Sequence, residues 1–192
     1  MNIKITSFFS LLLVFAVTSC SSDKGATTSS ANKTNSDIML STDGVGPINA
    51  STPFNMHQVT LAFQDYSVTE YTQFQDGDSI PVIRVSENGT PLLLINPDES
   101  KENIFSIFVM SKKIGNSLGH EIGSPYNSIY NYGETEPCIA GTEEFIGKVL
   151  CMAPKAANLL YVFSGKWDGP KKETPPTAIL ASWELDTIIW RP

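Results

Sequence analysis

The feature that most constrains this chain is an apolar N-terminal segment that ends at a cysteine. Met1 to Lys4 forms a short positive start, Phe8 to Val17 is almost wholly apolar, and small residues precede Cys20. The apolar run is about half of the ~20 residues that a membrane-spanning helix needs. This arrangement is typical of a signal peptide, which is removed and takes no part in the fold. We therefore expect the domain behind it to be exported.

Cys20 separates two kinds of export signal. Val17-Thr18-Ser19-Cys20 resembles the bacterial lipobox, whose cysteine is alkylated with diacylglycerol before signal peptidase II cuts the chain. The alternative is an ordinary secretory signal with an incidental cysteine. Lipidation is our prediction. Each CH₂ group of an acyl chain that is buried in the membrane stabilises the attachment by ~0.8 kcal/mol, so several chains would make the anchor effectively permanent. By resemblance to the sorting rule of enteric bacteria, Ser21 and Ser22 favour the periplasmic face of the outer membrane.

The chain is expected to divide into three parts. Residues 1–19 are the predicted signal peptide, residues 20–37 the lipidated cysteine and a flexible tether, and residues 38–192 a periplasmic α+β domain. The tether has no aromatic and no branched aliphatic residue. It therefore buries too little apolar surface to offset its ordering entropy. The remaining length is typical of one domain with one core.

The charge balance disfavours some classes of partner. The chain has 13 Lys and Arg against 20 Asp and Glu, and removal of residues 1–19 deletes only Lys4, which leaves 12 against 20, a net charge of −8. Nucleic acids and anionic lipid headgroups both require a basic surface. We therefore expect no nucleic-acid partner, and attachment to the membrane only through the lipid anchor.

Two cysteines remain once Cys20 is lipidated. Cys138 and Cys151 form an even pair in an oxidising compartment, which predicts a disulfide. The loop that they close has 14 residues counting both ends, and the chain-entropy model gives such a loop ~3 kcal/mol. A redox pair would more often have C-x-x-C spacing, and no neighbouring histidine completes a metal site.

Cap signals predict two short helices. Thr52-Pro53 and Ser124-Pro125 each place an N-cap residue before a proline at the first helical position. The first helix is expected to end at about Gln64. The second is expected to pass Tyr132 and stop at Gly133.

The other apolar runs predict strands, and the fold class is α+β with a mainly antiparallel sheet. Asn88-Gly89 predicts a hairpin turn. Residues 178–190 fit either a strand or a helix, and we prefer a strand with a bulge near Asp186. The remaining strand-like runs are 66–74, 80–86, 91–96, 104–111, 145–152 and 159–163.

One motif suggests an enzyme. Gly115-Asn116-Ser117-Leu118-Gly119 matches G-x-S-x-G, the nucleophile elbow of α/β-hydrolases. An elbow serine needs a helix directly after it, and then an acid and a distant histidine in chain order. Here Gly123 and Pro125 interrupt the helix, and the only later histidine, His120, is three residues away. A glycine-rich turn explains the motif, so we predict that the protein is not an enzyme.

Neither a metal site nor a cofactor is predicted. His120-Glu121 lacks the second histidine of H-E-x-x-H, and His57 stands alone in the first helix. Asp76-Gly77-Asp78 lacks the spaced acids and the closing glutamate of a calcium loop, so a tight turn is the preferred interpretation. Glu143-Glu144 are adjacent rather than facing, which is poor geometry for a catalytic pair.

Aromatic side chains predict a contact surface. Trp167 lies in the polar turn Gly-Lys-Trp-Asp-Gly-Pro, and Tyr126 and Tyr130 lie in the second predicted helix. Tyr and Trp are favoured on surfaces that bind a partner. Core packing is the alternative for these residues. It is our interpretation of five aromatic residues that lie in apolar runs, namely Phe105, Phe108, Phe163, Trp183 and Trp190.

A set of short motifs extends from the start of the predicted domain to the C-terminus. They are Gly44-Val45-Gly46-Pro47-Ile48, Thr52-Pro53-Phe54, Gly115, Gly119, Gly123-Ser124, Cys138, Gly141, Cys151 and Ile189-Trp190-Arg191-Pro192. Together with the lipobox they resemble the sigma-E-regulated lipoproteins of enteric bacteria, a family that is itself a domain of unknown function. The resemblance implies an outer-envelope location and expression under envelope stress, and it carries over no catalytic residue.

Two function classes follow from these observations. The first is a non-catalytic binding or accessory module that acts on unfolded outer-membrane proteins, peptidoglycan or another lipoprotein. The second is an inhibitor of host lysozyme, because an acidic domain complements a cationic enzyme. Phe163-Ser164-Gly165-Lys166 is faintly similar to the Ser-Gly loop of such inhibitors. A hydrolase that uses the G-x-S-x-G segment comes third.

Overall fold

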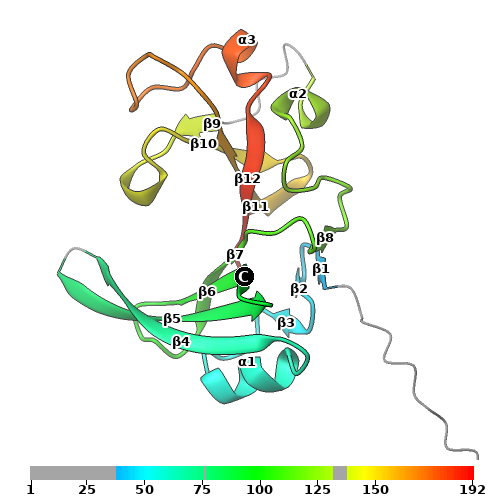
Figure 1. Cartoon of the computed structure of the whole chain (residues 1–192), viewed down its shortest axis with the longest axis vertical. Coiled ribbons are helices and arrows are strands. Elements are labelled where there is room, and N and C mark those ends of the chain that lie inside the picture. Colours follow the sequence, from blue (N-terminus) through cyan, green and yellow to red (C-terminus); the bar gives the residue numbers. More distant parts are fainter. Residues whose placement is uncertain (1–37, 76, 132–137) are drawn as a thin grey trace, which may run out of the picture. The chain divides into compact units, whose positions relative to one another are not determined.

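An eight-stranded antiparallel sheet organises the described part of the chain (Figure 1). This computed structural model describes residues 38–75, 77–131 and 138–192, so the predicted signal peptide and tether lie outside the described residues. The strands, in their order across the sheet, are β4 (Ser67–Gln75), β5 (Asp78–Glu87), β6 (Thr90–Pro97), β7 (Ile104–Val109), β12 (Glu184–Trp190), β11 (Ala156–Ser164), β10 (Val149–Ala153) and β9 (Cys138–Ala140).

The turn between β5 and β6 is the one that the sequence predicts. Asn88 and Gly89 have φ angles of 49° and 79°. A two-residue hairpin turn of type I′ needs positive φ at both central positions, which asparagine and glycine adopt most readily. The predicted hairpin is therefore confirmed, and it sets the pairing of Glu87 with Thr90.

The ambiguous segment 178–190 contains both kinds of structure. A single helical turn, α3 (Thr177–Leu180), precedes strand β12. Val162 pairs with Thr187 and Phe163 pairs with Leu185, so one residue of β12, Asp186, is extra. This is a β-bulge, as predicted.

A second, four-stranded sheet was not predicted. Its order is β3 (Ile48–Asn49), β2 (Gly44–Val45), β1 (Met39–Leu40) and β8 (Gly115–Asn116). The β1–β8 pair is parallel and joins segments far apart in the chain, while the other two pairs are antiparallel. Strands of two residues are too short to show an alternating hydrophobic pattern, which is why sequence periodicity missed them.

The first helix begins later than predicted. Helix α1 (Met56–Ala62) is capped by Asn55, whose side chain accepts hydrogen bonds from the backbone N–H groups of His57 and Gln58. Thr52 instead donates its backbone N–H to Asn49 in a turn, so the Thr52-Pro53 cap signal was wrong. Asparagine is as strong an N-cap as serine or threonine, and the side chain that reaches the free N–H groups decides the boundary.

The remaining helical segments are short. Helix α2 (Tyr126–Ile129) is one turn, with Pro125 at its N-cap position, rather than a helix that begins after Ser124 and passes Tyr132. Tyr132 itself lies outside the described residues. A 3₁₀ turn, η1 (Glu143–Phe145), occupies the start of the run predicted as a strand from 145. The described residues thus contain three short α-helices where two were predicted.

One face of the large sheet forms the core. A row of cross-strand partners runs over five strands of this face, and no side chain in it is more than 1% exposed. Its members are Ile83, Ile95, Ile107, Trp190 and Leu159. Helix α1, the small sheet and α2 contribute buried residues to the same apolar cluster. At ~25 cal/mol per Å² of buried apolar surface, this face is the main source of stability. The fold is therefore a mainly antiparallel β structure with a few short helices, which agrees with the predicted class.

The described residues, from Ile38 to the C-terminus, belong to one compact unit. Within residues 38–75, 77–131 and 138–192, no helix combines the length and apolarity that a membrane crossing requires.

Candidate functional site

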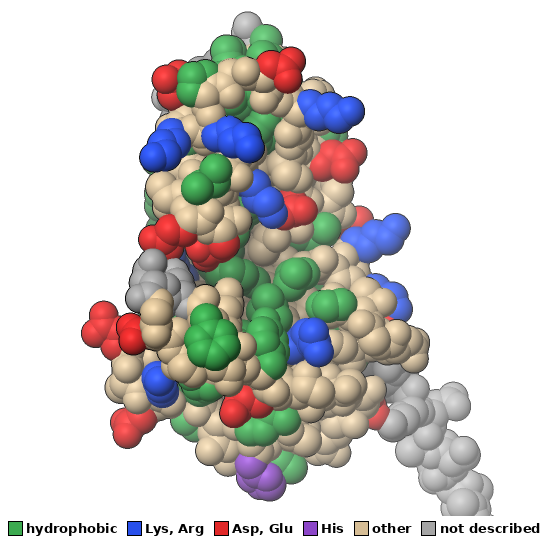
Figure 2. All heavy atoms as spheres, turned by 60° about the vertical axis from the view of Figure 1, so that its left-hand side comes forward, with side chains coloured by type: hydrophobic (Ala, Val, Ile, Leu, Met, Phe, Trp, Pro, Cys, Tyr) green, Lys and Arg blue, Asp and Glu red, His purple; other side chains and the backbone are tan. Residues whose placement is uncertain are grey.

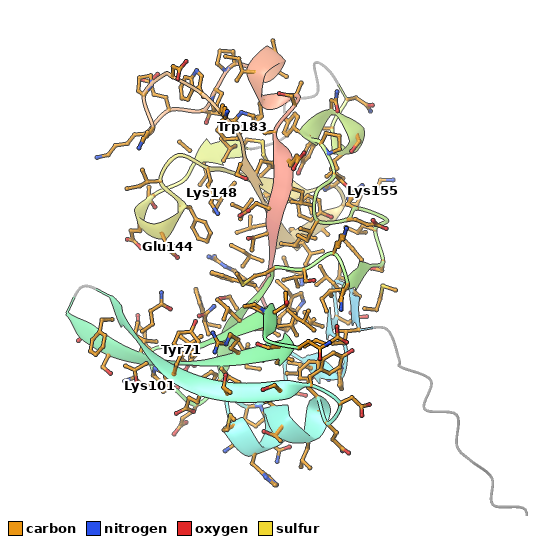
Figure 3. All side chains as sticks on the ribbon, in the orientation of Figure 1. Tyr71, Lys101, Glu144, Lys148, Lys155 and Trp183 are labelled. Atoms are coloured by element: carbon orange, nitrogen blue, oxygen red, sulfur yellow. A yellow bond between two sulfur atoms is a disulfide. The ribbon has the colours of Figure 1, made fainter. Side chains whose placement is uncertain are left out.

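A pocket of about 370 Å³ lies where three loops meet beside the end of the large sheet. We call it the Trp pocket. One wall is the loop that follows β11, a second is the turn between η1 and β10, and the third is Trp183, which directly precedes β12 (Figure 3). Its lining residues are Ile146, Gly147, Gly165, Lys166, Trp167, Asp168, Gly169, Lys171 and Trp183.

Two glycines allow the loop to lie against the indole rings. A Cβ atom at Gly165 would lie 2.2 Å from Cδ1 of Trp183, and a Cβ atom at Gly169 would lie 2.2 Å from Cζ2 of Trp167. Carbon atoms pack at about 3.5 to 4.0 Å, so neither position accepts a larger residue without a shift. The spacing Gly-x-x-x-Gly in this loop therefore serves the close packing of two tryptophans.

Trp183 carries an unpaired polar group at this site. Its side chain is 3% exposed, and its indole Nε1–H has no hydrogen-bond partner among the described residues. A buried donor without an acceptor costs about 1 to 3 kcal/mol. Native proteins leave few such groups, and each one calls for an explanation. The Nε1 atom is covered by the loop at Gly165, so an acceptor oxygen from a bound molecule would remove this cost once that loop shifts.

The charged groups around the Trp pocket are exposed. Lys166 and Lys171 contribute two positive charges to its lining, and Asp168 contributes one negative charge. The mouth is therefore locally more positive than the acidic chain as a whole. This arrangement suits a molecule that offers hydrogen-bond acceptors or a carboxylate.

The sequence identified half of this site. Trp167, predicted as a contact residue, is half-buried and lines the pocket. Trp183 was assigned to the core, and it is in the core cluster, but it also forms the pocket wall. The two glycines that flank Trp167 were a usable signal, because paired glycines in a loop often mark a close approach to a large ring or a ligand.

The two tyrosines predicted as contact residues do not form part of the site. Tyr126 and Tyr130 are 5% and 2% exposed and pack against each other and against Phe163. The hydroxyl of Tyr130 donates to the backbone carbonyl of Met152 at 2.7 Å. Their rings are therefore core residues, and their contact role is corrected. A tyrosine can be buried when its hydroxyl finds an acceptor, which a sequence does not reveal.

The predicted disulfide is present. Cys138 and Cys151 are direct partners in the β9–β10 pair, and their Sγ atoms are bonded. The bond joins the short edge strand β9 to the rest of the sheet.

The G-x-S-x-G segment does not form a catalytic triad. Ser117 is exposed, and the side-chain hydrogen bond that His120 makes among the described residues is to another residue. His120 Nδ1 instead lies 2.9 Å from the hydroxyl of Tyr161, which also accepts a hydrogen bond from Asn116 Nδ2 at 3.1 Å. Burial lowers the pKa of His120 and raises that of Tyr161. This cluster satisfies the hydroxyl of a buried tyrosine.

A second pocket, of about 730 Å³, lies beside the β6–β7 loop. Asp98 organises this loop by accepting hydrogen bonds from the side chains of Ser100 and Asn103 at 2.7 and 2.9 Å. The bonds from Asn103 and Ser100 lower the pKa of Asp98 to about 2. Asp98 is therefore ionised at neutral pH and has no proton to donate as a general acid.

The described residues contain no group of three or more His, Cys, Asp or Glu side chains placed to hold a metal ion. His57 is exposed on α1. The predicted turn at Asp76 falls on a residue outside the described ones.

A family comparison accounts for nearly the whole chain. The model of the family described as "Protein of unknown function (DUF1131)" matches residues 21–192. The chain belongs to this family. It is similar to the "Uncharacterized protein YfeY" of Escherichia coli (strain K12), with 29% identity over 181 residues that cover 91% of this chain and 92% of that protein. The predicted kinship with a domain of unknown function in enteric bacteria is therefore confirmed.

A solved structure supports the fold. The crystal structure of the uncharacterized protein yfeY from Escherichia coli matches with a TM-score of 0.67 and 26% identity, and the match covers 81% of this chain and 99% of that chain. The mainly antiparallel sheet with few helices is thus shared with an experimental structure.

Proposed function

We propose that this protein is a non-catalytic binding module that is anchored by a lipid on Cys20 to the periplasmic face of the outer membrane. The Trp pocket is its contact site. The partner is a protein or a cell-wall component that presents an acceptor oxygen, and the resemblance to sigma-E-regulated lipoproteins connects the role to envelope stress.

One observation carries the proposal. The indole N–H of Trp183 is a buried donor without a hydrogen-bond partner among the described residues. Lys166 and Trp167, in the loop that follows β11, line the same pocket. Packing alone does not require the N–H, because phenylalanine offers a buried aromatic ring without an unpaired donor, although its smaller ring fills less of the space. Tryptophan is also one of the residues that supply most of the binding energy at interfaces.

Photo-crosslinking in cells tests the contact site. The full chain with p-benzoylphenylalanine in place of Lys166 should form an adduct of defined mass after irradiation. The matched control replaces Lys155, which is exposed in the turn between β10 and β11 on the other side of the sheet (Figure 3). The absence of an adduct at position 166, or the same adducts at both positions, would contradict the proposal.

Metabolic labelling tests the anchor. Radioactive palmitate should label the mature protein, and globomycin should cause its precursor to accumulate. The Cys20→Ala variant should lose both effects. An unlabelled mature protein would exclude lipidation, whatever the result at Lys166.

Lysozyme inhibition is the second candidate and receives less support from the site. The loop with the faint Ser-Gly similarity places Lys166 and Lys171 at the pocket, and these charges would repel a cationic enzyme. A turbidity assay with purified protein and lysozyme decides the point, and undiminished lysis would exclude this candidate.

A further inference from the structure

The face of the large sheet opposite the core carries a row of its own, made of one arginine and five apolar residues. Each member is the direct cross-strand partner of the next. In order across the sheet they are Arg84 (β5), Leu94 (β6), Phe108 (β7), Ile189 (β12), Leu160 (β11) and Met152 (β10). Direct partners in an antiparallel sheet point to the same face. We call this set the outer row.

The outer row is separate from the core and partly open to solvent. None of its members belongs to the core cluster. Leu94, Phe108, Leu160 and Met152 are half-buried and Ile189, between Phe108 and Leu160, is 2% exposed, whereas every member of the neighbouring row on the other face is fully buried. Contiguous apolar surface that stays accessible in a folded domain commonly marks a binding site.

This face is hollowed. Figure 2 shows hydrophobic side chains at the bottom of a depression between two parts of the molecule. Phe145 of η1 reaches over the sheet to Phe108, with 5.8 Å between their ring centroids. Lys148 stands on the side of η1 with Glu144, and Tyr71 of β4 stands on the opposite side (Figure 3). The ammonium of Lys148 is paired with Asp186 at 2.5 Å.

Both arginines of the chain lie on this face. Arg84 begins the outer row, and Arg191 follows Ile189 by two residues, the strand period that returns a side chain to the same face. Each guanidinium lies over an exposed aromatic ring, Arg84 over Tyr71 at 5.4 Å and Arg191 over Phe105 at 5.0 Å. Neither has a carboxylate partner among the described residues.

We propose that the outer row binds one acyl chain of a membrane lipid, and that Arg84 and Arg191 contact its anionic headgroup. The acidic balance of the chain disfavours adsorption on a whole anionic membrane, but it does not prevent two unpaired arginines from holding a single headgroup. The pocket beyond Phe105 is not part of the path, because Asp78, Asp98 and Glu99 line it and would repel an anion.

The dimensions and chemistry of the row fit an acyl chain. The apolar part of the row, from Leu94 to Met152, crosses five strands, which at about 4.8 Å per spacing is about 19 Å. An acyl chain that fills half of a ~30 Å hydrocarbon core needs about 15 Å. The row lies in the interior of the sheet, where both neighbours of each strand are already hydrogen-bonded, so a peptide cannot bind there by strand addition. An acyl chain needs no hydrogen bonds.

Crosslinking with a phosphate label tests the proposal independently of the Trp pocket. The full chain carries p-benzoylphenylalanine in place of Phe108, in cells grown with [³²P]phosphate. The predicted anchor on Cys20 is a diacylglycerol without phosphate, so the label reports only a separate lipid. The control position is Leu61 on α1, which is 50% exposed.

The expected result is ³²P on the protein after irradiation at position 108 and not at position 61. Arg84→Gln combined with Arg191→Gln should lower the label about tenfold, as the loss of charge-assisted contacts predicts, and Lys155→Gln should leave it unchanged. Both arginines are exposed, so these changes should preserve the fold, which circular dichroism checks.

Four results would overturn the proposal. They are no label at position 108, equal label at position 61, label that is insensitive to the arginine changes, and an adduct with the mass of a peptide or protein. The last would assign the outer row to a protein partner instead.

Discussion

At the scale of single residues, burial decides how His120 responds to pH. The imidazole lies beside the buried Tyr161, with Nδ1 2.9 Å from the Tyr161 hydroxyl, and Asn116 donates a hydrogen bond to the same hydroxyl. Burial lowers the pKa of His120 below its ordinary value of 6.5. The unfolded chain therefore binds a proton at a higher pH than the folded chain does.

This difference predicts a pH-dependent stability. The contribution of His120 is complete above about pH 6.5 and declines as the pH falls from there through the lower folded pKa. Urea unfolding between pH 7.5 and pH 5 should show this loss. His120→Gln should reduce the slope and His57→Gln, at an exposed position, should keep it. An unchanged slope in His120→Gln would show that another group is responsible.

Gly165 is the second residue at which a small change has a defined effect. Gly165→Ala places a methyl group 2.2 to 2.5 Å from three atoms of the buried Trp183 ring. Overpacking of this kind costs about 1 to 3 kcal/mol. Urea unfolding followed by far-ultraviolet circular dichroism should show that loss, whereas the neighbouring Lys166→Ala should stay within about 0.5 kcal/mol. Equal urea midpoints for the two variants would mean that the loop shifts to accommodate the methyl group without a measurable loss of stability.

At the scale of elements, the disulfide holds strand β9 to the sheet. The strand has three residues and one neighbour, β10. Replacement of Cys138 and Cys151 by serine should lower the free energy of unfolding by about 2 to 3 kcal/mol, since the open chain gains loop entropy. Urea midpoints measure this loss. Dithiothreitol should destabilise the parent protein by a similar amount and should leave the double variant unchanged. A further loss of stability in the double variant would contradict the assignment of this effect to the disulfide.

At the scale of the whole molecule, the sheet has a core face and an outer face, and adjacent residues report on them separately. Leu93 is fully buried in the core, and Leu94 is half-buried in the outer row. Leu93→Ala should cost about 2 to 5 kcal/mol. Leu94→Ala should cost less than about 1.5 kcal/mol, because it leaves no closed cavity. Equal costs in urea unfolding would show that the outer face is packed like the core.

Local patterns predicted a substantial part of this fold. The Asn88-Gly89 turn, the bulge at Asp186 and the disulfide all follow from chemistry within a few residues or from a single pair. The small sheet was missed because its two-residue strands have no period. The cap at Asn55 was missed because several capping residues compete within one turn, and only the backbone geometry selects one.

The sequence by itself determined the longer strands of the large sheet, the disulfide pair and the presence of a tryptophan in a polar, glycine-bounded loop. These features depend on backbone preferences and on periods of two residues, which are local. Tertiary structure alone decided that Tyr126 and Tyr130 are buried, that Trp183 meets the loop of Trp167, and that two arginines 107 residues apart share one face. The reason is physical: strand pairing between distant segments sets which side chains become neighbours, and that pairing is not encoded in any short stretch of the chain.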